Sequence, residues 1–216
     1  RRVYRNLALF RPAHHNRAKA CMLPPAYNHA QNFSHFLGQS LSGHVGRNDM
    51  SFDEENAMPQ LDAVTLAVLQ GRLEQIADEM DATLFRSAFN PIIAEAHDAS
   101  HGIYAPDTGE TLIQGKSGLP IFVGAMAFAV KTVIDKQASA GGPLPGDVFL
   151  FNDAWDGGTH LSDFKLVKPI FRSGALYCYL ASVAHWHDVG GNVPGNYNPA
   201  ATEAFQEGMV IPPVRL

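Results

Sequence analysis

The chain has 216 residues, of which 46% are hydrophobic, and no apolar run long enough to cross a bilayer, so wholesale disorder and a membrane-spanning segment are excluded. Its two cysteines, Cys21 and Cys178, are too few for a disulfide framework, which favours the reducing cytoplasm. The net charge of −5 divides unevenly along the chain. Residues 1–48 carry seven Lys or Arg and no Asp or Glu, whereas residues 49–216 carry nine Lys or Arg and twenty-one Asp or Glu. The acidic character of the second part argues against nucleic-acid binding there.

Residues 1–57 differ in composition from the rest of the chain. They are rich in Arg, His and Asn, hold five of the ten histidines and lack a sustained helical or strand period. A transit peptide, or a basic arm that binds metal or nucleic acid, would have this composition. We favour a disordered or mis-translated N-terminal extension, because position 1 is Arg and Met50 and Met58 closely precede the first ordered pattern.

Two helices are predicted beyond residue 59. Apolar residues recur at three- and four-residue intervals in an amphipathic helix over residues 62–88, with Asp62 as its cap and Pro91 as its end. The second helix, over residues 122–137, is apolar nearly all round at its start and is therefore expected to be buried. Gly141 and the glycine after it end this helix.

The remaining pattern predicts strands joined by turns. Apolar and β-branched runs separated by turn residues indicate two hairpins, one formed by residues 95–104 with 110–114 and the other by residues 166–171 with 175–184. Residues 147–151 are expected to form a central strand, and residues 190–213 a final ordered loop. We expect an α+β fold over residues 59–216, a mixed sheet with hairpins packed by the two helices. The abrupt apolar end at residues 211–216 suggests the N-terminal fragment of a larger domain, truncated at its C-terminus.

Histidines and carboxylates concentrate in two clusters, each beside a pair of glycines. His160 and Asp163 share one face if they lie on a helical turn. His185 and His187 end the predicted strand and, by the alternation of strands, point to the same side. The hairpin permits the end of its second strand to return beside the start of its first. The four side chains would then meet at one end of the sheet.

Imidazole and carboxylate together form a ligand set that zinc, manganese and iron accept, so this pattern predicts a divalent metal centre. The alternative is that these histidines end strands and hydrogen-bond to neighbouring backbone. Asp98 has a weaker claim, since a lone carboxylate is more often a turn or cap residue. The spacing does not match a phosphate-binding loop, a dinucleotide fingerprint or a nucleophile elbow.

Three motifs resemble those of the hydantoinase B/oxoprolinase family. Residues 152–163 (NDAWDGGTHLSD) resemble its N-D-P-Y-x-G-G-T-H-x-x-D motif, residues 185–195 (HWHDVGGNVPG) its H-x-x-D-[IV]-G-G-x-x-P-G segment, and residues 206–213 (QEGMVIPP) its E-G-x-x-I-P-P stretch. The resemblance begins near Leu61 and continues to Leu216. Its three motifs stand in the family's order, which makes it specific.

The resemblance implies an enzyme that works with an A-type partner. The family includes the B-type subunits of N-methylhydantoinase and caprolactamase, the C-terminal half of 5-oxoprolinases and related subunits of acetone and acetophenone carboxylases. In it the A part binds ATP-Mg and phosphorylates the carbonyl oxygen of a small-molecule substrate, and the B part carries the metal. Metal-ligand roles thereby fall on Asp98, His160, Asp163 and His185. His187 and Asp188 remain candidate catalytic residues that would orient a ligand or move a proton.

Departures from the family pattern leave the substrate open. Ala154 and Trp155 replace the usual Pro-Tyr, and residues 195–199 differ from the Pro-Gly-Ser-Met of typical hydantoinases. We expect an ATP-dependent hydrolase of a cyclic amide: a hydantoin, a lactam or 5-oxoproline. A carboxylase-like relative that joins a phosphorylated enol to activated carbonate is the alternative, and so is an inactive fragment of either enzyme.

Overall fold

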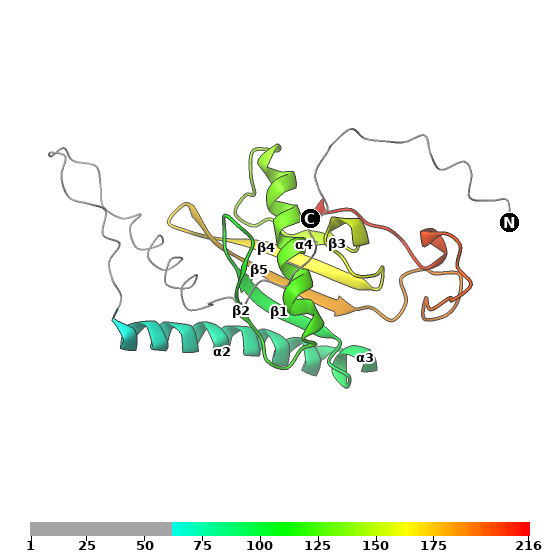
Figure 1. The fold of residues 1–216 in the computed structure, drawn as a ribbon, viewed down its shortest axis with the longest axis horizontal. Coiled ribbons are helices and arrows are strands. Elements are labelled where there is room, and N and C mark those ends of the chain that lie inside the picture. Colours follow the sequence, from blue (N-terminus) through cyan, green and yellow to red (C-terminus); the bar gives the residue numbers. More distant parts are fainter. Residues whose placement is uncertain (1–61) are drawn as a thin grey trace, which may run out of the picture.

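The computed structural model describes residues 62–216, so the expectation for residues 1–57 lies outside the described part of the chain. The described part is an antiparallel sheet with helices on its faces (Figure 1). Its helices are α2 (Ala63–Ser87), α3 (Pro91–Ala94) and α4 (Ile121–Ala138), with short 3-10 turns η1 (Ala154–Asp156) and η2 (Ala204–Gln206). Both predicted long helices are confirmed to within one residue at each end.

Six strands form the sheet in the order β2-β1-β5-β4-β3-β6, and every pairing is antiparallel. They are β1 (Ala99–Tyr104), β2 (Thr111–Gln114), β3 (Phe149–Phe151), β4 (Asp163–Arg172), β5 (Ala175–His185) and β6 (Val214–Arg215). The α+β class and both hairpins are confirmed. The expected mixture of parallel and antiparallel strands is not found in residues 62–216. Every strand of the sheet there runs antiparallel to the strands beside it. The β4–β5 turn uses Ser173 and Gly174 at positive φ (51° and 82°), the combination that matches strand twist.

The two long helices cover opposite faces of the sheet. Tyr104 packs in one core cluster with Met126 and Val130 of α4. Its neighbour Ile103 packs in another with Ala77 of α2. Because successive strand residues point to opposite faces, this division places α4 on one side of the sheet and α2 on the other. Within residues 62–216, no helix combines the length and apolar character needed to cross a membrane.

Local chemistry explains where α2 begins and what its apolar face covers. The Asp62 carboxylate accepts hydrogen bonds from the backbone N–H groups of Val64 and Thr65, both at 3.0 Å, which satisfies two free donors of the first turn. Ala77 and Phe85 of this helix are buried against the sheet. The predicted cap and amphipathic face are therefore confirmed. Pro91 begins α3 and does not simply end α2, since its fixed φ suits a first helical position.

Strand β3 lies near one edge of the sheet, where only the two-residue β6 flanks it, and not at its centre as its apolar sequence suggested. Phe149 and Phe151 face the α4 core. Leu150 packs on the other side against a cluster that includes Phe164 and Ile211. The chain end therefore covers the second face of this strand. An apolar run predicts burial on both faces but not position in the sheet.

Candidate metal centre

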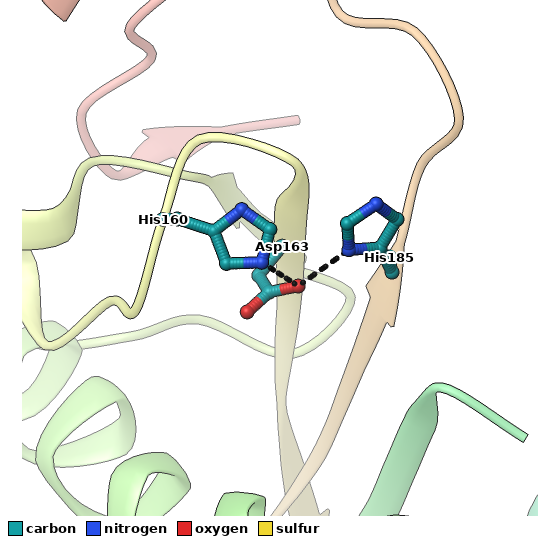
Figure 2. A group of neighbouring side chains, drawn as sticks. All are labelled: His160, Asp163 and His185. Atoms are coloured by element: carbon teal, nitrogen blue, oxygen red, sulfur yellow. Dashed lines mark ion pairs between the residues drawn. The ribbon is translucent and has the colours of Figure 1, made fainter. Parts of the chain in front are cut away.

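The structure brings together three of the side chains predicted as metal ligands: His160, Asp163 and His185 (Figure 2). Asp163 is the first residue of β4 and His185 the last residue of β5, and the two are paired directly across the hairpin. His160 comes from the loop just before β4. Oδ1 of Asp163 lies 3.1 Å from Nε2 of His160 and 3.5 Å from Nδ1 of His185. The hairpin thus produces the convergence that the sequence only permitted.

Asp98 joins this group from the residue before β1. Its Oδ2 lies 3.6 Å from Nδ1 of His185, and its backbone oxygen accepts a 3.0 Å hydrogen bond from the N–H of the same histidine. The side chain of Asn90, the cap of α3, donates to the backbone oxygen of His185 at 3.0 Å. The N–H of Asp98 donates to the oxygen of Ile92 in α3 at 3.0 Å. Helix α3 therefore fixes Asp98 against the end of β5.

The donor atoms fit a shared divalent ion. Oδ1 of Asp163 and Nδ1 of His185 are buried, yet neither has a hydrogen bond within residues 62–216. Buried polar atoms without partners are rare in folded proteins and need a reason. Ligand atoms bound at zinc-like lengths around one tetrahedral ion lie about 3.3–3.6 Å apart. The spacings of 3.5 and 3.6 Å fall within that range, and the spacing of 3.1 Å between Asp163 and His160 is slightly shorter. An ion among these atoms would satisfy both orphaned groups.

The electrostatics of the cluster favour a charged carboxylate facing imidazole. Burial opposes ionisation of Asp163, but the close contacts with His160 and His185 and the hydrogen bond from Thr159 outweigh it and hold the pKa of this carboxyl well below its usual range. The contact with Asp163 raises the pKa of His160 against the effect of burial. Burial raises the pKa of Asp98, and the negative charge of Asp163 adds to this effect. Metal uptake would therefore displace protons from the cluster.

The loop that carries His160 is held from several sides. The hydroxyl of Thr159 donates to Oδ2 of Asp163, which leaves Oδ1 facing the two imidazoles. Gly157 has φ 82°, and a Cβ there would lie 2.7 Å from the backbone nitrogen of Ala129 in α4. Only glycine allows this close approach without displacement. The loop is thereby pressed onto α4 and aimed at the end of β4.

Asn152 ties the same loop to the end of the chain. Its buried side chain donates to the backbone oxygens of Leu161 at 2.8 Å and Met209 at 2.7 Å, and accepts from the N–H of Ile211 at 2.7 Å. This network makes Asn152 a structural anchor of the loop around the site. The sequence analysis included Asn152 only as the first residue of the first family motif and did not predict this role.

Lys165 is a further buried group that the sequence did not single out. Its side chain points to the α4 face one row inside Asp163, since residues two apart on a strand share a face. Its Nζ donates to the backbone oxygen of Asp163 at 2.9 Å and lies 2.7 Å from where a Cβ on Gly158 would sit. Burial lowers the pKa of Lys165 to about 8, against the opposing charges of Asp163 and Asp153. A lone Lys among apolar residues gave no signal of this environment.

His187 and Asp188 lie outside the cluster of donor atoms. Strand β5 ends at His185, so strand alternation does not extend to His187, whose side chain is exposed. The carboxylate of Asp188 accepts a 2.9 Å hydrogen bond from the N–H of Gly190 and so closes its own turn. Trp186, between His185 and His187, stacks on Phe164, with ring centroids 4.3 Å apart. The catalytic roles suggested for His187 and Asp188 stay predictions.

Comparisons with known proteins identify the family and the fold. The sequence model of the hydantoinase B/oxoprolinase family matches residues 62–216. The caprolactamase subunit beta of Pseudomonas jessenii is 36% identical over 163 residues, covering 74% of this chain and 27% of that protein. A 5-oxoprolinase of Dictyostelium discoideum is 32% identical over 152 residues, covering 70% of this chain and 12% of that protein. This chain therefore spans only about a quarter or less of these relatives.

Two solved structures share the fold. The crystal structure of the ATP-dependent caprolactamase from Pseudomonas jessenii superposes with a TM-score of 0.62 at 31% identity, covering 72% of this chain and 26% of the other. A nucleotide-free acetone carboxylase superposes with a TM-score of 0.53 at 27% identity, covering 58% of this chain and 16% of the other. The family match, the relatives and the shared fold lead to one conclusion: this chain belongs to the hydantoinase B/oxoprolinase family.

Proposed function

We propose that this chain is part of the B-type subunit of an ATP-dependent cyclic amide hydrolase, with a divalent ion held by Asp98, His160, Asp163 and His185. The observation that carries the proposal is the pair of orphaned buried atoms, Oδ1 of Asp163 and Nδ1 of His185, which face each other across the hairpin. Zinc, manganese and iron all suit two carboxylates with two imidazoles. The similarity to caprolactamase and 5-oxoprolinase supports the cyclic amide as substrate.

Each residue of the site would have a distinct task. A divalent ion bound there would lower the pKa of a water molecule and stabilise negative charge that develops on oxygen. Thr159 fixes the rotation of the Asp163 carboxylate, so that Oδ1 stays directed at the imidazoles. His187, exposed beside the cluster, would accept or return a proton at one of its ring nitrogens, and Asp188 would hold the turn that presents it.

An A-type partner would complete the enzyme. An unstrained amide is a poor electrophile, and phosphorylation of its oxygen makes the carbonyl carbon more electrophilic. Water would add to this carbon, the ring C–N bond would break to release the amine, and a second water would hydrolyse the resulting acyl phosphate to a carboxylate and phosphate. We infer that the partner binds ATP-Mg and performs this phosphorylation, because the related caprolactamase from Pseudomonas jessenii is ATP-dependent. The substrate would then be opened at the metal centre. A cytoplasmic location, expected from cysteine usage, fits the need for ATP and stays a prediction.

A pair of histidine substitutions tests the proposal. In the complete enzyme with its partner, His160→Ala should abolish both bound metal and ATP-driven ring opening. His187→Ala is the matched variant, which should keep the metal and slow the reaction. Metal content by mass spectrometry and ring-opened product by chromatography are the two measurements. Full ring opening by a metal-free His160→Ala enzyme would reject the proposed centre.

A carboxylase is the second candidate, favoured by the structural similarity to acetone carboxylase. The same residues would then hold the ion beside an enol phosphate and an activated carbonate. A carbon–carbon bond would form as the carbonate loses its activating group, and water would remove the phosphate of the enol. The products separate the two functions. A ring-opened amino acid that forms without bicarbonate supports the hydrolase, whereas a carboxylated ketone that requires bicarbonate supports the carboxylase.

A further inference from the structure

The residue before Asp98 has a backbone conformation that is uncommon for a residue with a side chain. His97 has φ 54°, and among the non-glycine residues of 62–216 only Ser173 and Asn196 also have a positive φ. This left-handed conformation brings Cβ too close to a carbonyl oxygen. Helices often end on such a residue, usually Gly and sometimes Asn. His97 is the third residue after α3, so a histidine stands where glycine would meet no steric cost.

The side chain of His97 packs against the end of α2. Its imidazole stacks on the ring of Phe85, with ring centroids 4.1 Å apart and planes at 10°. Phe85 is buried and packs in one core cluster with Ile93 of α3 and Ala99 of β1. Helix α3 lies beside this end of α2 (Figure 1). Because a stacked aromatic pair adds stability beyond the area it buries, the contact offsets the cost of the left-handed backbone and holds it in place.

Hydrogen bonds fix the backbone on both sides of Asp98. The N–H of Ala99 donates to the oxygen of His97 at 2.7 Å, which closes a γ-turn with Asp98 at its centre. The N–H of Asp98 donates to the oxygen of Ile92, and its own oxygen accepts from the N–H of His185, both at 3.0 Å. The backbone of Asp98 is therefore fully bonded. The left-handed His97 turns the chain from α3 into this arrangement.

We propose that His97 is a positioning residue, whose left-handed backbone and stack on Phe85 direct the carboxylate of Asp98 toward His185. The inference rests on the proposed metal centre and adds what sets the place of its fourth ligand. Asp98 needs such support because neither the β4–β5 hairpin nor the loop before β4 supplies it. Its Oδ2 lies 3.6 Å from Nδ1 of His185. A ligand has to be held within about 0.5 Å of its productive position.

Competitive titration of the full-length protein against a zinc-binding indicator tests this role. His97→Val should lower zinc affinity about 10- to 100-fold, because a β-branched side chain disfavours positive φ and cannot stack. His97→Asn tolerates positive φ but also cannot stack, so it should lower affinity only about two- to fivefold. Phe85→Leu removes the stack and keeps an apolar side chain, and it should cause the same small loss.

Two comparisons separate positioning from general destabilisation. In an Asp98→Ala background, which lacks the carboxylate, His97→Val should cause no further loss of zinc affinity, because the effects of coupled residues do not add. Ser173→Val is the matched control, since Ser173 has φ 51° in the turn at the far end of the β4–β5 hairpin. It should lower the midpoint of chemical unfolding and leave zinc affinity unchanged.

The outcomes distinguish the positioning role from the metal centre itself. Zinc affinity unchanged by His97→Val, or lowered equally with and without the Asp98 carboxylate, overturns the positioning role while the centre stands. If His97→Val does not fold, His97→Asn and Phe85→Leu decide: unchanged affinity in both overturns the role, and a loss confined to proteins that retain Asp98 supports it. An unmodified protein that binds no divalent ion overturns both proposals.

Discussion

Removal of the Thr159 hydroxyl should weaken metal binding without removing a proposed ligand. This hydroxyl donates to Oδ2 of Asp163, whose side chain is only 2% exposed, so water cannot readily replace it. Thr159→Val preserves shape and deletes the donor, and the carboxylate then loses the contact that fixes its rotation. Loss of such an outer hydrogen bond typically reduces metal affinity 10- to 100-fold. That range corresponds to about 1.4–2.7 kcal/mol of binding free energy.

A competitive titration against a zinc-binding indicator measures this change on the full-length protein. Thr159→Ser keeps a hydroxyl and should recover most of the affinity. Thr83→Val is the control, because the Thr83 hydroxyl bonds only the backbone oxygen of Glu79 in α2, away from the centre. If Thr159→Val folds normally and binds zinc as tightly as the unmodified protein, then Thr159 does not position Asp163 and our assignment of its role is wrong.

Two further changes test the loop and the charges of the site. Gly157→Ala should lower the free energy of unfolding by about 1–3 kcal/mol in chemical denaturation, because φ is 82° and the new Cβ would meet the backbone of Ala129; unchanged stability would refute the tight contact. In metal-free protein, the lowered pKa of Asp163 stabilises the fold above about pH 4, and this contribution is lost as pH falls through the folded pKa. The raised pKa of Asp98 has the opposite effect on stability. The raised pKa of His160 stabilises the fold below about pH 6.5, and this contribution is lost as pH rises through its folded pKa. The contribution of the cluster to stability should therefore peak between about pH 4 and pH 6.5. A stability maximum of the cluster above pH 8 would contradict the directions of these pKa shifts.

Periodicity and turn chemistry were sufficient to predict most of the fold. The Asp62 cap, the bounds of α4 and the Ser173-Gly174 turn depend on contacts within a few residues, and such local signals are readable in the sequence. The expected burial of α4 is met on one face only, because Ile121, Val123 and Phe128 are exposed. The position of β3 near the sheet edge depends instead on the return of the chain end to pair as β6. That pairing joins residues more than sixty positions apart and involves only two residues, so no local pattern announces it.

The site divides in the same way. His160, Asp163 and His185 were predictable as a group, because one hairpin connects their segments and its register follows from a short turn. Asp98 comes before β1, and three strands separate it from Asp163 in the sequence, so its place beside His185 depends on the β1–β5 pairing. Residue spacing could not supply that pairing, and only the family resemblance pointed to Asp98. For His187 the sequence predicted too much. Strand alternation was applied to His187, although β5 ends at His185.

Exposure determines from which side a ligand reaches the centre. The side chain of His160 is 51% exposed, whereas those of Asp163 and His185 are 2% and 19% exposed. The sheet and α4 close the buried side, so the accessible side is the one that His160 presents. A cavity of about 460 Å³ lies beside His160, lined also by Leu161, Ser162 and Tyr197. A molecule in that cavity would therefore meet the centre past a single imidazole, and the cavity is lined by loops separate from the strands that supply Asp163 and His185.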